Sequence, residues 1–184
     1  GINAKLAIGP AIESGFYYDI ELPATRKIGE DDLVQIEKKM KEILPTWERF
    51  ERKEVDERTA RTTFMENQYK NELISEILAK NEPITLYTSG KFTDLCRGGH
   101  VDTIKELDPA AFKLSHVAGA YWRGDEKNQM LTRIYGIAFA STEELATYQL
   151  QQAEALKRDH KKLGRELGLF TLSPLIGSGL PLMQ

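Results

Sequence analysis

Residues 84–100 have the sequence ITLYTSGKFTDLCRGGH, and the fold is interpreted outward from this stretch. Ile84–Tyr87 and Phe92–Cys96 are short runs rich in β-branched and aromatic residues, with Ser89-Gly90 between them as a turn signal. The pattern predicts an antiparallel hairpin. Its second strand runs into a glycine-rich loop, and reactive side chains often lie on such loops.

Helical and strand-like patterns continue on both sides of this hairpin. Upstream, Leu6–Ile12 and Phe16–Leu22 predict another hairpin. Apolar residues at three- and four-residue spacing predict a helix over Glu30–Leu44, which Pro45 ends. Further elements are predicted as strands over Trp47–Val55, Ala111–Leu114, Tyr121–Arg123 and Met130–Ala140, and as helices over Asp56–Glu66 and Tyr69–Lys80, the latter with Leu73, Ile77 and Leu78 inward.

The composition of the chain changes after Ser141. From there to Leu167 the pattern stays helical, without proline and with only a thin apolar face, which suits a connector better than a core helix. We therefore expect an α+β fold, with an antiparallel sheet, helices packed on one face, and a long projecting linker helix. The expected boundaries are 1–141 for the main domain, 142–168 for the linker helix and 169–184 for the start of another domain.

The overall composition limits the class of protein. The 184 residues are 41% hydrophobic and 29% charged, as in ordinary soluble domains. The net charge of -3 gives no sign of a basic stripe that grips a nucleic-acid duplex. No apolar run reaches about 18 residues, so no membrane span is expected. The single cysteine suits a reducing compartment and a cytoplasmic location, and the missing initiator Met suggests a piece of a longer protein.

Cys96 and His100 stand four residues apart, and Asp94 lies two residues before the cysteine. The pair can supply two of four zinc ligands, or a thiol nucleophile with its base. It can equally be a small buried cysteine beside a hydrogen-bonded histidine. A fourth interpretation is a non-covalent pocket in which His100 moves protons. The residues alone leave all four open.

Three other features each have a functional and a structural interpretation, and the structural one is favoured. Lys70 is typical of a surface lysine that lays its stem on apolar neighbours. Tyr17 and Tyr18 should point to opposite faces of a strand and pack there. Residues 119–125, GAYWRGD, suit stacking on a base with an Arg–phosphate contact. A hairpin with core aromatics and an Arg123–Asp125 surface pair is the preferred interpretation.

Seven motifs in order resemble the threonyl-tRNA synthetase family. They are Ala7–Pro10, Gly15–Asp19, Asp94–His100, Gly119–Asp125, Arg133–Gly136, Lys157–Gly164 and Gly177–Pro181. The resemblance covers essentially the whole chain. It implies an editing (second additional) domain over 1–141 that lacks its N-terminal helix, then the linker helix, then the first residues of the aminoacylation domain.

This resemblance implies hydrolysis of seryl-tRNA(Thr), the product of mischarging. Serine fits any pocket built for threonine, and selection against one missing methyl is worth only about 1–3 kcal/mol. A second pocket too small for the threonine methyl removes the error, and aminoacyl-tRNA synthetases are the established case of this remedy.

Carried over by position, the resemblance implies an editing pocket lined by Tyr18, Lys70, Asp94, Cys96 and His100. His100 and Lys70 would orient or activate a water for attack on the ester carbonyl. Lys70 would also stabilise the oxyanion or the departing ribose oxygen. Asp94 would anchor the serine ammonium or fix a neighbouring side chain. Tyr18 and Cys96 would bind substrate, with Cys96 shaping the small side-chain pocket rather than attacking.

The family also carries an H-x-x-x-H helix upstream of Ala7–Pro10, and in metal-binding relatives those two histidines join Cys96 and His100 as ligands. The sequence begins after that helix, so we expect no bound metal and no cofactor here. ATP, magnesium and zinc would serve the parent's catalytic domain. Expected partners are the serine-charged acceptor end of tRNA(Thr) and the other synthetase domains, with a homodimeric parent and no membrane. The alternatives are a non-catalytic tRNA acceptor-end binding module and a free-standing trans-editing hydrolase.

Overall fold

The computed structural model describes residues 3–158, 170–172 and 181–183. The chain separates into two compact units, Gly1–Thr142 and Glu143–Gln184. All of the residues expected at the candidate site belong to the first unit.

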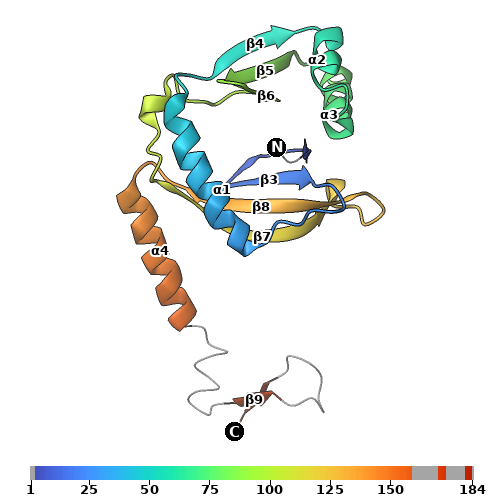
Figure 1. Cartoon of the computed structure of the whole chain (residues 1–184). Coiled ribbons are helices and arrows are strands. Elements are labelled where there is room, and N and C mark those ends of the chain that lie inside the picture. The colour runs from blue at the N-terminus through green and yellow to red at the C-terminus, as the bar shows by residue number, and fades with distance from the viewer. Residues whose placement is uncertain (1–2, 159–169, 173–180, 184) are drawn as a thin grey trace. The chain divides into compact units, whose positions relative to one another are not determined.

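The first unit contains two antiparallel sheets (Figure 1). The larger has the strand order β1-β3-β8-β7, with β2 also paired to β3, and the smaller has the order β4-β5-β6. The strands are β1 (Lys5–Leu6), β2 (Ala11–Ile12), β3 (Gly15–Glu21), β4 (Glu51–Val55), β5 (Ile84–Ser89), β6 (Phe92–Leu95), β7 (Phe112–Tyr121) and β8 (Met130–Ala138). The helices are α1 (Glu30–Ile43), α2 (Glu57–Thr63) and α3 (Gln68–Ala79), with short 3₁₀ turns η1 (Leu44–Thr46), η2 (Ile104–Glu106) and η3 (Trp122–Gly124).

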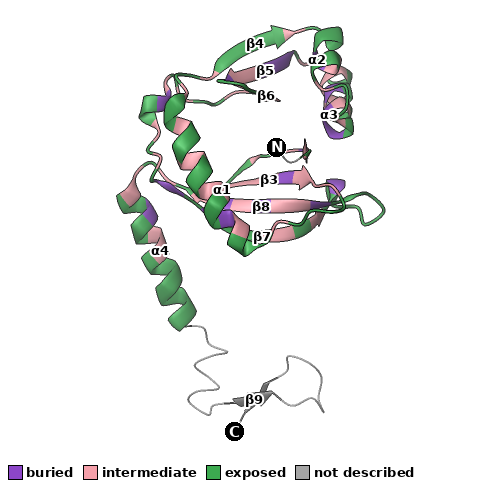
Figure 2. Ribbon diagram, viewed as in Figure 1, coloured by how far each residue is buried: buried purple, intermediate pink, exposed green. Residues whose placement is uncertain are grey.

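Each sheet has its own helices and its own apolar core. Figure 1 shows α1 lying across the larger sheet, where Leu33 packs against Leu114 and Ile134. Ala60 of α2 and Ile74 of α3 pack against the smaller sheet. In that sheet β5 is largely buried while β4 is exposed (Figure 2).

A third core cluster joins α3 to the larger sheet. Tyr69 at the start of α3 is buried with Ala7, Trp122 and Leu131. The Tyr69 ring meets Trp122 edge-on at 5.0 Å, and its hydroxyl donates to Glu21 Oε2 at 2.8 Å. Burial and this hydrogen bond raise the pKa of Tyr69 to about 12, so the hydroxyl remains a donor. This cluster brings α3 within reach of both sheets.

The α+β class and the main elements agree with the sequence prediction, and the strands are divided between two sheets where one was expected. The predicted strand Leu6–Ile12 is split into β1 and β2 because Gly9-Pro10 interrupts it, and proline has no N–H for a ladder. The predicted hairpin turn shifts by one residue, since Ser89 pairs with Phe92. Leu73, Ile77 and Leu78 of α3 pack inward as predicted.

Two predictions in the β7–β8 region were wrong in extent. The short strand Ala111–Leu114 is in fact the ten-residue β7, because an irregularity between Leu114 and His116 breaks the alternating pattern. The strand predicted over Tyr121–Arg123 ends at its first residue. Trp122 starts a 3₁₀ turn, and Arg123 has a left-handed φ of 61°.

In the second unit, helix α4 (Thr142–Lys157) begins near the predicted position. The rest of the predicted helix, to Leu167, lies outside the described residues. Strands β9 (Phe170–Leu172) and β10 (Pro181–Met183) pair antiparallel, in the segment expected to begin another domain. The linker role and the boundaries 1–141, 142–168 and 169–184 remain predictions. None of the described helices is long and apolar enough to cross a membrane.

Candidate functional site

Side chains from three elements that are distant in sequence meet at Asp94. Lys70 of α3 places Nζ 2.5 Å from Asp94 Oδ1. Tyr18 of β3 donates its hydroxyl hydrogen to Asp94 Oδ2. Lys70 Nζ also donates to the Tyr18 hydroxyl at 3.3 Å, so the three groups form a closed ring of contacts. The backbone N–H of Leu95 donates to Asp94 Oδ1 at 2.8 Å and fixes the carboxylate orientation.

The start of α3 determines where Lys70 lies. Asn67 caps the helix, and its side chain accepts from Lys70 N at 3.2 Å. The same side chain donates to the carbonyl of Leu6 at 2.8 Å and ties the cap to β1. Because β1 pairs with β3, the first turn of α3, which carries Lys70, lies close to Tyr18 of β3. Lys70 is therefore 2% exposed, and the prediction of a surface lysine was wrong.

A buried ammonium group needs a partner, because leaving it unpaired in a low-dielectric interior is strongly unfavourable. Asp94 is that partner, and its side chain is itself only 15% exposed. Burial raises the pKa of Tyr18 strongly, and the charge of Asp94, the hydrogen bond to it and nearby Cys96 add to the rise. Tyr18 therefore stays protonated and acts as a hydrogen-bond donor rather than as a base.

Cys96 directly follows β6 and begins the glycine-rich loop. Asp94 and Cys96 are two residues apart, so their side chains lie on the same side of the extended chain. Thr85 of β5 holds Cys96 twice: its carbonyl accepts from Cys96 N at 3.2 Å, and its hydroxyl donates to the Cys96 carbonyl. Sequence reasoning missed Thr85, although a threonine between apolar Ile84 and Leu86 is an available signal.

His100 closes the loop back onto the cysteine. Its Nε2 lies 3.7 Å from Cys96 Sγ. The imidazole sits between Phe50 and Tyr87, with ring centres 4.5 and 4.3 Å away. Partial burial among these groups lowers the pKa of His100, so the neutral form predominates near pH 7. Neither flanking aromatic was recognised from the sequence, because neither belongs to a motif quoted above.

The two glycines of the loop have separate physical roles. Gly98 has φ 116°, and a Cβ there would lie 2.8 Å from the Tyr87 hydroxyl. Gly99 has φ 84° with open space around it, so it is needed for its backbone conformation alone. Together they let the chain turn from Cys96 back to His100.

Gly9 supports the site from the other side. A Cβ at this position would lie 2.2 Å from Cδ2 of Tyr18, so only glycine leaves room for the tyrosine ring. Tyr17 points away, toward Tyr135 and Arg133, as the alternation predicted. The Ala7–Pro10 motif therefore seats Tyr18 rather than contributing a reactive group.

The structure thus places the five predicted residues in two contacting sets. Tyr18, Lys70 and Asp94 form one set and Cys96 and His100 form the other, and Asp94 and Cys96 are two residues apart on the same segment. The chemical roles assigned to them above are not tested by this geometry and remain predictions.

The site meets part of the requirement for a metal. With Zn–S of about 2.3 Å and Zn–N of about 2.1 Å, two tetrahedral ligands lie about 3.6 Å apart. The Cys96–His100 separation of 3.7 Å matches this value. Within residues 3–158 and the two C-terminal strands, however, no three His, Cys, Asp or Glu side chains gather around one point. Two ligands do not hold a zinc ion firmly, and the expectation of no bound metal remains a prediction.

The GAYWRGD segment packs against α3. Trp122 is buried, and its Nε1 donates to Glu72 Oε2 of α3 at 2.8 Å. Arg123 lies over the Trp122 ring and pairs with Glu72 and Glu76. The core aromatic was predicted correctly, while the expected Arg123–Asp125 pair is replaced by these contacts to α3.

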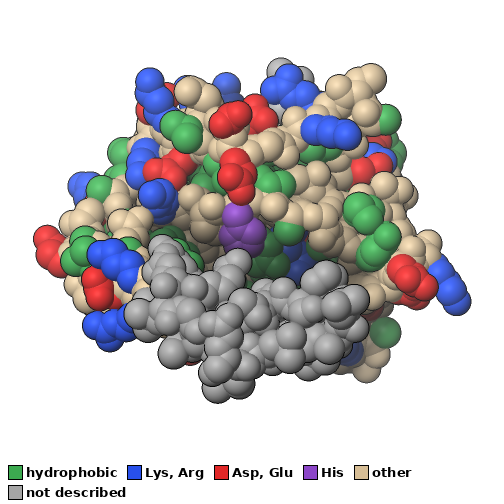
Figure 3. Space-filling model, turned by 90° about the horizontal axis from the view of Figure 1, so that it is seen from below, with side chains coloured by type: hydrophobic (Ala, Val, Ile, Leu, Met, Phe, Trp, Pro, Cys, Tyr) green, Lys and Arg blue, Asp and Glu red, His purple; other side chains and the backbone are tan. Residues whose placement is uncertain are grey.

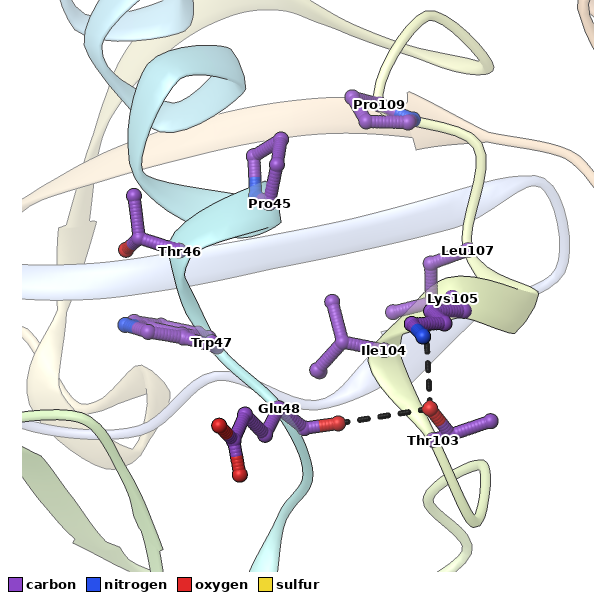
Figure 4. Close-up of a pocket in the computed structure, with 9 residues that line it drawn as sticks. All are labelled: Pro45, Thr46, Trp47, Glu48, Thr103, Ile104, Lys105, Leu107 and Pro109. Carbon is purple, nitrogen blue, oxygen red and sulfur yellow. Dashed lines mark hydrogen bonds between the residues drawn. The ribbon is translucent and has the colours of Figure 1, made fainter.

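A hollow of 680 Å³ lies between η1 and η2, and none of the five predicted site residues lines it. It is lined by Pro45, Thr46, Trp47, Glu48, Thr103, Ile104, Lys105, Leu107 and Pro109. Figure 4 shows Thr103, whose hydroxyl donates to the Glu48 carbonyl on the other wall and accepts from the Lys105 N–H on its own wall. The lining has no close pair of titratable groups, so we place the candidate site at Asp94 rather than in the hollow.

Comparison with known proteins identifies the class of domain around this site. Residues 84–135 match the family model described as "Threonyl and Alanyl tRNA synthetase second additional domain". The matched range contains Asp94, Cys96 and His100. It begins after α3, which carries Lys70, and ends before α4.

The particular relatives are threonine–tRNA ligases. The chain is 52% identical to that of Borrelia duttonii (strain Ly) over 178 residues, which is 97% of this chain and 30% of the relative. It is 51% identical to the enzyme of Deinococcus deserti over the same length, 27% of that relative. The resemblance to threonyl-tRNA synthetases is therefore confirmed along nearly the whole chain, which spans about 30% of the length of the curated relatives it matches.

Proposed function

We propose that this chain is the editing segment of a threonine–tRNA ligase and that its site hydrolyses the ester of seryl-tRNA(Thr). The observation that carries the proposal is the buried contact of Lys70, Asp94 and Tyr18 beside the Cys96–His100 pair. A buried lysine held by a carboxylate can stabilise an oxyanion, and a neutral histidine can act as a general base, so these residue types suit ester hydrolysis by water.

His100 is the proposed general base. Its lowered pKa keeps the ring neutral near pH 7, so one ring nitrogen can accept a proton from water as the water oxygen attacks the ester carbonyl. The protonated imidazole then returns that proton to the departing ribose oxygen. The acyl C–O bond breaks, and free serine and tRNA are released.

Lys70 is the proposed electrostatic stabiliser of the oxyanion. Its ammonium group has three N–H donors, and Asp94 and Tyr18 use two of them. The third is available to the carbonyl oxygen as negative charge develops there. Asp94 already accepts from Lys70, Tyr18 and Leu95, so orienting neighbouring groups suits it better than anchoring the serine ammonium alone.

Cys96 is proposed to limit the size of the amino-acid pocket. Thr85 holds the backbone of Cys96 on both sides, so the thiol has little freedom to retreat from a bulkier side chain. Rejection of one added methyl in such a pocket is worth about 1–3 kcal/mol.

The proposed partners follow from this substrate. They are the serine-charged acceptor end of tRNA(Thr) and the remaining synthetase domains of a homodimeric, cytoplasmic parent. On the face seen in Figure 3, Lys and Arg side chains are interspersed with Asp and Glu. That mixture suits local contact with an acceptor end rather than a broad grip on a duplex.

The test is single-turnover deacylation of seryl-tRNA(Thr) by the wild type and by His100→Ala. Loss of a general base lowers such rates by about 10²- to 10⁴-fold. We expect a loss in that range with an unchanged thermal unfolding curve, because His100 lies in an exposed loop. A near-normal rate in the variant would refute the role of His100.

The Cys96–His100 contact supports a second mechanism, in which the thiolate attacks and an acyl-enzyme forms. Cys96→Ala separates the two, because the water mechanism retains turnover and the thiol mechanism loses it. The two alternative functions have their own signatures. Acceptor-end binding without deacylation, by this chain and by one extended at its N-terminus, favours a binding module. Full activity of a protein ending at residue 141 favours a free-standing hydrolase.

A further inference from the structure

Four aromatic side chains form a continuous run from the candidate site to the surface. His100 contacts Phe50 at 4.5 Å between ring centres. Phe50 meets Trp47 edge-on at 6.3 Å, and Trp47 is followed by Phe92 at 6.5 Å. Among the described residues, none of these four belongs to the three apolar core clusters. Core packing therefore does not account for the run.

The outer end of the run is a surface of parallel rings. Trp47 and Phe92 are inclined by only 4° to each other, and Phe92 is 41% exposed. The turn between β5 and β6 holds the indole: a Cβ on Gly90 would lie 2.9 Å from Trp47 Nε1. In Figure 4 the Trp47 ring points away from Ile104 on the opposite wall of the hollow, so closing the hollow is not its role.

We propose that Trp47 and Phe92 stack the single-stranded cytidines that precede the terminal adenosine of the tRNA 3′ end. This inference rests on the proposed function, which puts the ester of that adenosine beside His100. Phe92 is exposed and Trp47 is half-buried beside it, and accessible aromatic rings are the usual platform for unpaired bases, since every base has a flat face to stack. Neither ring is among the five residues proposed for the editing pocket, so the stacking surface adds to the catalytic group rather than restating it.

Two lysines lie near Trp47 and Phe92. Lys91 precedes Phe92 in the β5–β6 turn, and Lys105 stands on the wall of the hollow opposite Trp47 (Figure 4). Both are exposed, and within residues 3–158 neither has an ion-pair partner. They suit contact with one or two phosphates, so the salt dependence of binding should be shallow, with one counterion released per contact.

The two tryptophans make the proposal directly measurable. Trp122 is buried and Trp47 is on the proposed surface, and the chain contains no others. The probe is an RNA hairpin that carries no amino acid and has a single-stranded 3′ ACCA end. The control is the same hairpin without those four nucleotides. Saturable quenching of tryptophan emission by the first hairpin alone is expected. Trp47→Phe, which retains only Trp122, should show none.

The second measurement uses Phe92→Ala. Loss of one stacked base should weaken hairpin binding by about 5- to 150-fold. KM for seryl-tRNA(Thr) should rise by a similar factor, while kinetics on the serine ester of adenosine stay unchanged, because that substrate lacks the cytidines. Met65→Ala, at another exposed apolar residue, is the matched control and should change neither.

The possible failures are distinguishable. If the wild type hydrolyses neither ester, the proposed function fails, and the quenching experiment still reports on stacking. Three results would overturn the stacking surface: equal quenching by both hairpins, no quenching by either, or equal loss in Phe92→Ala on both substrates. No quenching would instead favour a protein domain as the occupant of this surface.

Discussion

Two ion pairs in the first unit each have one buried partner, the carboxylate of Asp19 in the first and the ammonium of Lys70 in the second. Arg133 grips Asp19 with two parallel hydrogen bonds, at 2.6 and 2.8 Å, and the two residues face each other on neighbouring strands. Lys70 meets Asp94 across elements that are far apart in sequence. Asp19 and Lys70 are each 2% exposed, so burial does not distinguish the pairs.

The difference lies in the side chains that accompany each pair. The guanidinium of Arg133 lies 3.9 Å from the centre of the Tyr17 ring, on the opposite face of β3 from Tyr18. The hydrogen bonds to Asp19 raise the pKa of Arg133 further, so its charge is permanent. The partner of Lys70 is Asp94, which lies two residues before Cys96, and the Cys96 thiol contacts the imidazole of His100. A buried ion pair is therefore a stronger candidate for a reactive site when nucleophilic and basic side chains accompany it.

Lys70→Met should produce the largest effect. It removes the proposed oxyanion donor, which lowers the deacylation rate by about 10²- to 10³-fold. It also leaves Asp94 unpaired and lowers the free energy of unfolding by about 3–5 kcal/mol. Arg133→Met is the matched control: a similar stability loss is expected, with the rate per folded molecule within a few-fold of wild type. Urea unfolding and single-turnover deacylation measure the two quantities, and equal rate losses in both variants would remove the distinction between the pairs.

Gly9→Ala should be next in size. The added Cβ would lie 2.2 Å from the Tyr18 ring, which must shift together with its hydrogen bond to Asp94. Displacements of about 1 Å at a catalytic group lower rates by about 10²-fold. Gly29→Ser is the control, because no atom lies within 4 Å of a Cβ there. Retention of the full rate by Gly9→Ala would mean that the position of Tyr18 is unimportant.

The pH dependence should report His100. Its pKa is lowered from the usual 6.5, and only the neutral ring accepts a proton. The deacylation rate should therefore rise with pH as the ring loses its proton, and it should level off at a lower pH than an ordinary histidine would give. A rate–pH profile measured on the folded protein tests this sign. A rate that falls over the same range would require the protonated ring to be the active form.

Thr85→Val should have the smallest effect. It removes the hydroxyl that donates to the Cys96 carbonyl, which lowers the free energy of unfolding by about 1 kcal/mol. The selectivity for serine over threonine should relax by a few-fold, since the thiol is less firmly held. Thr85→Ser restores the donor and should restore the selectivity; if it does not, packing of the methyl rather than the hydrogen bond is responsible.

The sequence supports some parts of this account better than others. The helix at Glu30 and the hairpin after Ile84 were predictable, because their apolar spacing and turn residues are local signals. The burial of Lys70 was not, since it depends on a bond from the Asn67 cap to a distant strand. The length of β7 was hidden by the irregularity after Leu114. Four of the five predicted site residues lie in the quoted motifs and Lys70 was carried over by position in the family resemblance, whereas Thr85 and Phe50 required the three-dimensional contacts.

The most direct test of the central claim compares the wild-type protein on two esters, seryl-tRNA(Thr) and threonyl-tRNA(Thr), under single-turnover conditions. A pocket that rejects one methyl should hydrolyse the serine ester about 10- to 200-fold faster. Equal rates on the two esters would contradict the account. So would the absence of serine-ester hydrolysis in both this chain and one extended at its N-terminus.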